Sequence, residues 1–258
     1  MPHITDRDEI RRILNLDPIW AAYPLGDLSP PHFACCEWHR HGDAFALVFR
    51  RYEIPILWTT GEAPDLAQIL DEIGDEPRLD LQVRPEALPA LEGRYQWQHL
   101  KTMLRMAVRP AAFHPAASNR GVERLSMQSL PDVERLYADG LADGTSPDYF
   151  FPSMLGEGVF FGARLNGELV CIAGTHVLAM EEGVAAVGNV YTRRDCRGQG
   201  YGTAAASAVV AALFGMGIDI AALNVNVENA AAIRVYESLG FRVHCEFREG
   251  MAERRKSR

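Results

Sequence analysis

The sequence predicts an α+β fold built in two halves. From residue 122 on, the predicted order of elements is β-α-α-β-β-β-α-β-α-β, with a helical crossover after the fourth strand. The first half has a similar coarse order without any sequence repeat. A segment rich in Pro, Ser, Asn and Gly at residues 109–121 separates the halves. A chain of 258 residues is long enough for two hydrophobic cores.

Hydrophobic periodicity defines the elements of the first half. A helix at residues 6–14 begins at a capping Asp6, and Pro18 is expected to open a short second helix through residue 20. Strands are predicted at 33–38, 44–50, 54–59, 79–83 and 95–106, and helices at 64–73 and 85–91. All four tryptophans lie in this half. These observations predict domains at 1–108 and 122–258, joined by a linker at 109–121.

The second half contains clearer signals. Asn166 and Gly167 both tolerate positive φ, which predicts a tight hairpin. Residues 201–214 are nearly all small or apolar, so this helix is expected to be buried against a sheet. Strands are predicted at 124–127, 159–164, 169–177, 183–192, 221–227 and 242–247, and helices at 130–138, 201–214 and 229–240. Residues 147–155 are expected to form either a further helix or an irregular segment.

Composition excludes several classes of function. A net charge of −8 argues against nonspecific nucleic-acid binding and weakly favours a cationic substrate. No apolar run approaches the ~18 residues of a membrane span, and the N-terminus lacks the apolar core of a signal peptide. Five cysteines without a CxxC pair indicate reduced thiols and a cytoplasmic protein. Residues 35–41 hold Cys, Glu and His at strand spacing, but a half-buried edge strand explains them better than a metal site.

A glycine-rich loop between the strand at 183–192 and the helix at 201–214 predicts an anion site. Gly198, Gly200 and Gly202 leave backbone N–H groups with no Cβ in the way. The helix that follows adds roughly half a positive elementary charge from its dipole. Arg197, with arginines 193 and 194 nearby, adds forked donors suited to phosphate. An ordinary glycine-rich turn is the alternative interpretation.

The spacing in this loop distinguishes among phosphate-binding motifs. No Lys is present for a P-loop, and the third glycine of a dinucleotide fingerprint is replaced by Thr203. The pattern Arg-x-x-Gly-x-Gly, from Arg197 to Gly202, resembles the pyrophosphate loop of the GNAT family of N-acetyltransferases.

A second motif strengthens this resemblance. Asn229 and Tyr236 are seven residues apart and therefore lie on one face of a helix. Each has an ordinary interpretation, as a helix cap and as a core residue. The pattern Asn-x-x-Ala-x-x-x-Tyr-x-x-x-Gly-Phe nevertheless resembles the C-terminal motif of the GNAT family, and the resemblance covers residues 122–248. The sequence of the second half is most similar to glycine N-acyltransferase-like C-terminal domains. The first half resembles a divergent N-terminal GNAT-like half.

The resemblance implies an α/β GNAT-type fold with a mixed, mostly antiparallel sheet flanked by helices, and it implies roles for individual residues. The backbone of three strand residues would pair with the pantetheine of acetyl-coenzyme A: Val190, Tyr191 and Thr192. The pyrophosphate would be held by the amides of Arg197, Gly198, Gln199, Gly200, Tyr201, Gly202 and Thr203. Asn229 would contact the pantetheine arm, and Tyr236 would protonate the leaving thiolate.

The implied activity is an N-acetyltransferase that moves an acetyl group from acetyl-CoA to a primary amine by direct attack, without a metal. The alternative is a noncatalytic acyl-CoA-binding or regulatory module. His176 and Glu246 are candidates for the base that takes the amine proton, although a structural role in the sheet for His176 and a surface position for Glu246 are the favoured interpretations. Cys196, next to the glycine loop, could have a depressed pKa. The identity of the amine and formation of a homodimer remain open.

Overall fold

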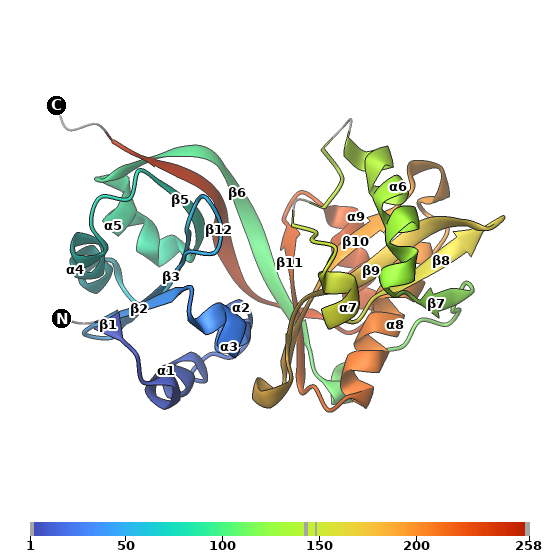
Figure 1. The fold of residues 1–258 in the computed structure, drawn as a ribbon, viewed down its shortest axis with the longest axis horizontal. Coiled ribbons are helices and arrows are strands. Elements are labelled where there is room, and N and C mark those ends of the chain that lie inside the picture. Colours follow the sequence, from blue (N-terminus) through green and yellow to red (C-terminus); the bar gives the residue numbers. More distant parts are fainter. Residues whose placement is uncertain (1–2, 142–143, 148, 256–258) are drawn as a thin grey trace. The chain divides into compact units, whose positions relative to one another are not determined.

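The computed structural model describes residues 3–141, 144–147 and 149–255, and their contacts form two compact units (Figure 1). Unit 1 comprises the chain up to Arg105, residues 226–228 and the chain from His244 on. Unit 2 comprises Met106–Val225 and Asn229–Val243. The units differ from the sequence-based limits chiefly because residues 244–254 continue a strand that pairs within unit 1, and residues 109–121 belong to unit 2.

Unit 1 is a sheet with helices from the first part of the chain. The strand order is β1-β2-β3-β4-β5-β12-β6, with β4 and β5 parallel and the β1/β2, β2/β3, β3/β4 and β5/β12 pairs antiparallel. The strands are β1 (His3–Ile4), β2 (Cys36–His41), β3 (Ala44–Phe49), β4 (Ile56–Thr60), β5 (Arg78–Val83), β6 (Tyr95–Val108) and β12 (Arg242–Arg254). The helices are α1 (Arg7–Leu14), α2 (Ala22–Gly26), α3 (Pro30–Phe33), α4 (Ala63–Ile73) and α5 (Leu88–Glu92).

Local chemistry explains both agreement and error in unit 1. The Asp6 side chain accepts hydrogen bonds from the first amides of α1, which confirms the predicted cap. The predicted helix at 18–20 is wrong: these residues form a turn, and α2 begins at Ala22. The strand predicted at 33–38 begins only at Cys36, because two prolines occupy the first turn of α3 and favour helix there.

Unit 2 has the strand order β11-β10-β9-β8-β7, in which only β10 and β11 are parallel. The strands are β7 (Val122–Arg124), β8 (Phe161–Leu165), β9 (Glu168–Ala179), β10 (Val184–Thr192) and β11 (Ile220–Asn226). The helices are α6 (Leu130–Leu141), α7 (Met154–Glu157), α8 (Tyr201–Gly215) and α9 (Ala230–Ser238). The predicted crossover is confirmed, since α8 connects the parallel pair. The mixed, mostly antiparallel sheet with flanking helices is therefore the observed fold class.

Two local predictions in unit 2 are also confirmed. Asn166 and Gly167 have φ values of 53° and 87° and turn the chain between β8 and β9. Helix α8 is buried through small residues, among them Ala204, Ala205 and Ala206, which allow close approach to the sheet. It therefore holds its N-terminus at a fixed place beside the end of β10.

No helix in the described part of the chain is long and apolar enough to cross a membrane.

Candidate functional site

The glycine loop has the backbone conformation that an anion cradle requires. Gly198 and Gly200 have φ values of 73° and 85°, a region that other residues rarely adopt. Gly200 is the N-cap of α8, and no side chain caps this end of the helix. The first hydrogen bond within the helix is donated by the Ala204 amide to the Gly200 carbonyl oxygen, at 3.0 Å. The amides of residues 201–203 therefore point beyond the helix end, where the dipole favours negative charge.

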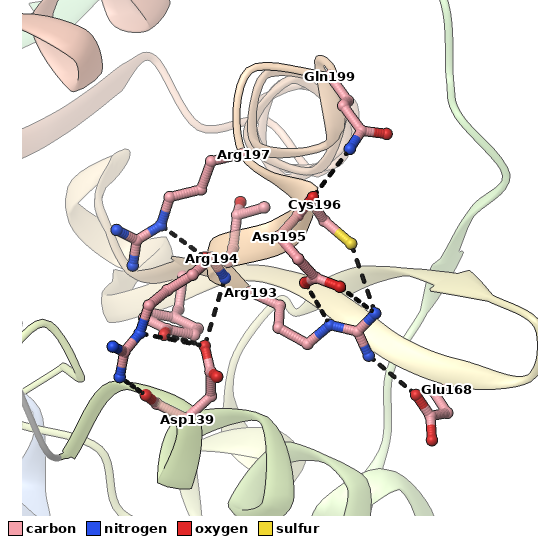
Figure 2. Close-up of polar contacts among 10 residues, drawn as sticks. Asp139, Glu168, Arg193, Arg194, Asp195, Cys196, Arg197 and Gln199 are labelled. Atoms are coloured by element: carbon pink, nitrogen blue, oxygen red, sulfur yellow. Dashed lines mark hydrogen bonds and ion pairs between the residues drawn. The ribbon is translucent and has the colours of Figure 1, made fainter.

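The arginines of this loop have different partners (Figure 2). Arg193 donates to Asp195 at 2.7 Å and to Glu168 at 2.9 Å. Arg194 contacts the carboxylate and the carbonyl oxygen of Asp139. The forked donors that the sequence analysis expects from arginines 193 and 194 therefore already have partners within the protein.

Arg197 connects the loop to the end of β10. Its Nε donates to the Thr192 carbonyl at 3.0 Å, and its terminal nitrogen donates to the Thr145 hydroxyl at 3.3 Å. The guanidinium also lies over the ring of Tyr191, 5.5 Å from its centroid. Gln199 donates its side-chain amide to the Asp195 carbonyl at 3.1 Å (Figure 2). These contacts to neutral groups hold the loop in its bent form while Arg197 keeps its charge.

Arg120 is a cation beside the cradle that the sequence analysis missed. Its Nε lies 3.6 Å from the place where a Cβ on Gly200 would stand, and its guanidinium is 6.0 Å from the ring centroid of Tyr201. Nothing in its local sequence, within the segment interpreted as a linker, indicates this position. Only the fold of unit 2 brings it to the helix N-terminus.

The end of β10 separates from β11 next to the cradle, while Tyr191 and Thr192 remain paired with β9. Pairing between β10 and β11 runs only from Val184 and Ile220 to Val187 and Leu223. On the other edge, the register with β9 is interrupted between Gly188 and Tyr191. Asn189, within this bulge, has a φ of 53°. Residues 190–192 therefore follow a bulge and extend past the last registered pair with β11.

Helix α9 brings the second motif into the same unit. The Asn229 side chain accepts a hydrogen bond from the Ala232 amide at 3.1 Å, so its capping role is present. Tyr236 is 8% exposed, and its ring lies 5.8 Å from the ring of Phe241. Helices α8 and α9 contact each other. Unit 2 thus contains the cradle, the end of β10, Asn229 and Tyr236.

The two candidate bases lie in different surroundings. His176 in β9 lies against Gly188, where an added Cβ would stand 2.5 Å from the imidazole Nδ1. Burial lowers the pKa of His176 to about 4, so the ring is neutral at pH 7. Glu246 lies in unit 1 and accepts from Arg248 at 2.6 Å. Of the two, only His176 belongs to the unit that holds the cradle.

The low pKa of His176 predicts a loss of stability in acid. An unfolded histidine titrates near pH ~6.5, so between pH 6.5 and pH 4 the unfolded chain binds a proton that the folded chain does not. Lowering the pH from 7 to 5 is therefore expected to remove about 2 kcal/mol of unfolding free energy. Urea titrations of wild type and His176→Gln at both pH values measure this contribution. An equal pH dependence in the two proteins would contradict it.

The thiol of Cys196 is not activated as a nucleophile. Its side chain is 2% exposed, and desolvation together with Asp195 raises its pKa. The expectation of a depressed pKa is therefore wrong, since the nearby Arg193 does not outweigh burial. Among the described residues, no group of three or more His, Cys, Asp or Glu side chains is placed to hold a metal ion.

Comparisons with known proteins agree with this geometry. Residues 127–241 match the Acetyltransferase (GNAT) family. A mycothiol acetyltransferase from Streptomyces coelicolor is 40% identical over 117 residues, which are 44% of this chain and 35% of that protein. The match thus spans about 35% of the length of this curated relative.

Two solved structures are similar over nearly the whole chain. A GNAT-family acetyltransferase structure from Novosphingobium aromaticivorans has a TM-score of 0.61 at 22% identity, covering 93% of this chain and 97% of that one. A GCN5-related N-acetyltransferase from Kribbella flavida has a TM-score of 0.64 at 17% identity, covering 92% and 96%. At these identities the similarity concerns the fold.

Proposed function

We propose that residues 127–241, which match the Acetyltransferase (GNAT) family, form an acetyltransferase domain, and that the protein transfers an acetyl group from acetyl-CoA to a primary amine. The observation that supports this most directly is the uncapped N-terminus of α8 behind two glycines with positive φ, beside the part of β10 that extends past its last registered pair with β11. A helix N-terminus of this form binds phosphate groups. The free end of a strand accepts an extended chain that carries amides.

The cofactor is proposed to lie across these two features. The amides of residues 197–203 bind the pyrophosphate, and Arg197 adds a positive charge. The backbone of residues 190–192 pairs with the pantetheine amides in the manner of an added strand. Asn229 contacts the pantetheine arm as it passes the start of α9. This arrangement directs the thioester toward the interior of unit 2, where Tyr236 lies.

The proposed reaction is a direct attack without an acyl-enzyme. The amine nitrogen forms a bond to the acetyl carbon, and the C–S bond of the thioester then breaks. Tyr236 gives its proton to the departing thiolate, while the amine loses a proton to a base or a chain of waters. A neutral His176 can accept a proton, although its low pKa makes it a weak base. Holding both reactants in line supplies much of the rate.

The acceptor is proposed to be a small or peptidic amine in the cytoplasm. All five cysteines are free, which suits a reducing compartment, and the net charge of −8 favours a cationic partner. Because the curated relatives are mycothiol acetyltransferases, their acceptor belongs in any substrate screen. The glycine N-acyltransferase-like character of the second half remains part of this proposal.

A screen of amines, amino acids, aminoglycosides, peptides and the mycothiol acetyltransferase acceptor tests the activity, with thiol release as the readout. Calorimetry with acetyl-CoA tests binding separately. Binding without thiol release for any acceptor would favour the alternative, a noncatalytic acyl-CoA-binding module. Absence of binding at millimolar acetyl-CoA would contradict both.

Arg120 provides a test of where the phosphates lie. Arg120→Ala is expected to raise KM for acetyl-CoA by roughly threefold while leaving kcat unchanged, because an exposed cation contributes modestly to phosphate binding. The effect should shrink in 1 M salt, where the Debye length is about 3 Å. KM measured at low and high salt checks this. Arg164→Ala is the control, since Arg164 pairs with Glu123 and Asp132; an equal change in both variants would count against a role for Arg120.

A further inference from the structure

The peptide between Asn189 and Val190 is held by a side chain from helix α6. The Tyr137 hydroxyl donates to the Asn189 carbonyl oxygen at 2.9 Å. Both residues are buried, with exposed fractions of 6% for Tyr137 and 3% for Asn189. Burial also raises the pKa of Tyr137, so the hydroxyl keeps its proton at neutral pH and can act as a donor. A buried hydrogen bond of this kind restrains the orientation of the whole peptide plane.

Asn189 needs such a restraint. Its φ of 53° lies in the left-handed region, which costs a residue with a Cβ conformational energy. The register with β9 passes from Gly188 opposite Gly174 to Tyr191 opposite Ile172, so the described pairing leaves Asn189 and Val190 without registered partners in β9. The described pairing with β11 has already ended at Val187. The strand ladder therefore does not define the direction of this peptide.

The position of the carbonyl defines the direction of the next amide. In a planar trans peptide, the C=O of one residue and the N–H of the next point in opposite directions. Because the Asn189 carbonyl points to Tyr137 on α6, the Val190 N–H points away from α6. The Val190 N–H therefore lies on the side of the bulge opposite α6, at a position with no registered partner in β9 or β11 among the described pairs.

Helix α6 is itself fixed to the residues that follow the bulge. Asp139 accepts from the Tyr191 hydroxyl at 2.6 Å and from the Arg194 amide at 3.3 Å. Gly140 allows the contact to be close, since an added Cβ would lie 2.8 Å from the Tyr191 ring. The helix that carries Tyr137 is therefore held in place by its contacts with residues 191 and 194.

We infer that Tyr137 is a positioning residue, which holds the Asn189 carbonyl so that the Val190 N–H is directed at the carbonyl oxygen of the acetyl group. The inference rests on the proposed function. A preorganised N–H at this oxygen stabilises the negative charge that develops as the amine attacks. Tyr137 touches neither reactant and acts only through the peptide it holds.

Tyr137→Phe removes one oxygen atom and retains the ring that packs in the core. The variant is expected to lower kcat by about 10- to 100-fold. This decrease is no larger than the one caused by removing an oxyanion-hole donor altogether. The Kd for CoA, measured by calorimetry, should stay within about twofold, since the cradle is unchanged. Tyr95→Phe is the matched control, because Tyr95 is also buried, at 1% exposure, but lies in unit 1.

Infrared spectroscopy of bound acetyl-CoA with a 13C-labelled acetyl carbonyl supplies a readout that needs no acceptor. In wild type and Tyr95→Phe, the carbonyl stretch is expected to shift to lower frequency on binding. In Tyr137→Phe the shift should largely disappear. The same stretch in all three proteins, or a parallel loss of CoA affinity and kcat in Tyr137→Phe, would overturn the inference.

The two proposals fail in different ways. If no amine is acetylated but the infrared difference is present, the proposed reaction is wrong and the role of Tyr137 stands. If wild type acetylates an amine and Tyr137→Phe matches it in kcat and in carbonyl frequency, the role of Tyr137 is wrong and the reaction stands. If acetyl-CoA does not bind to the folded wild type, both are wrong.

Discussion

Tyr236→Phe is expected to lower kcat by about 100-fold or more, because a positioned general acid contributes roughly 10²- to 10⁴-fold. Without the phenol, the thiolate must leave unprotonated or take a proton from water. The affinity for CoA should remain within about twofold, since the proposed contacts to the pyrophosphate and pantetheine come from other residues. Steady-state thiol release gives kcat, and calorimetry gives the Kd for CoA.

A comparison with Tyr95→Phe separates chemistry from stability. Both changes delete one hydroxyl from a buried tyrosine, at exposed fractions of 8% for Tyr236 and 1% for Tyr95. Only the Tyr236 variant should lose turnover. Wild-type turnover in Tyr236→Phe would remove the acid role from this residue, and the proton for the thiolate would then have to come from another donor or from water.

Gly200→Val is expected to weaken acetyl-CoA binding by about 100-fold. The φ of 85° is unfavourable for valine, and left-handed strain of about 1–2 kcal/mol alone corresponds to roughly a tenfold loss if the loop relaxes before binding. The added methyl groups also enter the space where the phosphate is proposed to lie, near Arg120. Calorimetric titration with acetyl-CoA measures the loss directly.

The same helix provides the control for this substitution. Gly215, the last residue of α8, has nothing within 4 Å of an added Cβ. Gly215→Val should therefore leave the affinity for acetyl-CoA within about twofold. If both variants lose affinity equally, the helix as a whole has been damaged and the cradle is not the cause.

Local sequence patterns were sufficient wherever a structure depends on neighbouring residues. The cap at Asp6, the hairpin at Asn166 and the cap at Asn229 each rely on contacts within a few residues, and each is present. The glycine loop belongs to the same class, because positive φ at Gly198 and Gly200 is a property of the loop and of residues without a Cβ. Of these features, the glycine loop and the cap at Asn229 belong to the family motifs.

Long-range pairing could not be predicted in the same way. Whether the guanidinium groups of Arg193 and Arg194 are paired with carboxylates depends on Glu168 and Asp139, which lie in another strand and in a helix. The restraint on Asn189 comes from Tyr137, and Arg120 reaches Gly200 from a segment that shows no periodicity. The pairing of β12 with β5 likewise joins residues 248–253 to residues 78–83 in unit 1.

The chain's own residues thus specified the α+β order, the bent loop before a buried helix, and the asparagine and tyrosine on one helix face. The tertiary structure determined which arginines near that loop are paired with carboxylates, which way the Asn189 peptide points, and which unit holds each candidate base. The difference has a physical origin: backbone conformation responds to adjacent residues, whereas charge neutralisation, desolvation and peptide orientation depend on groups that become neighbours only after the strands and helices have packed.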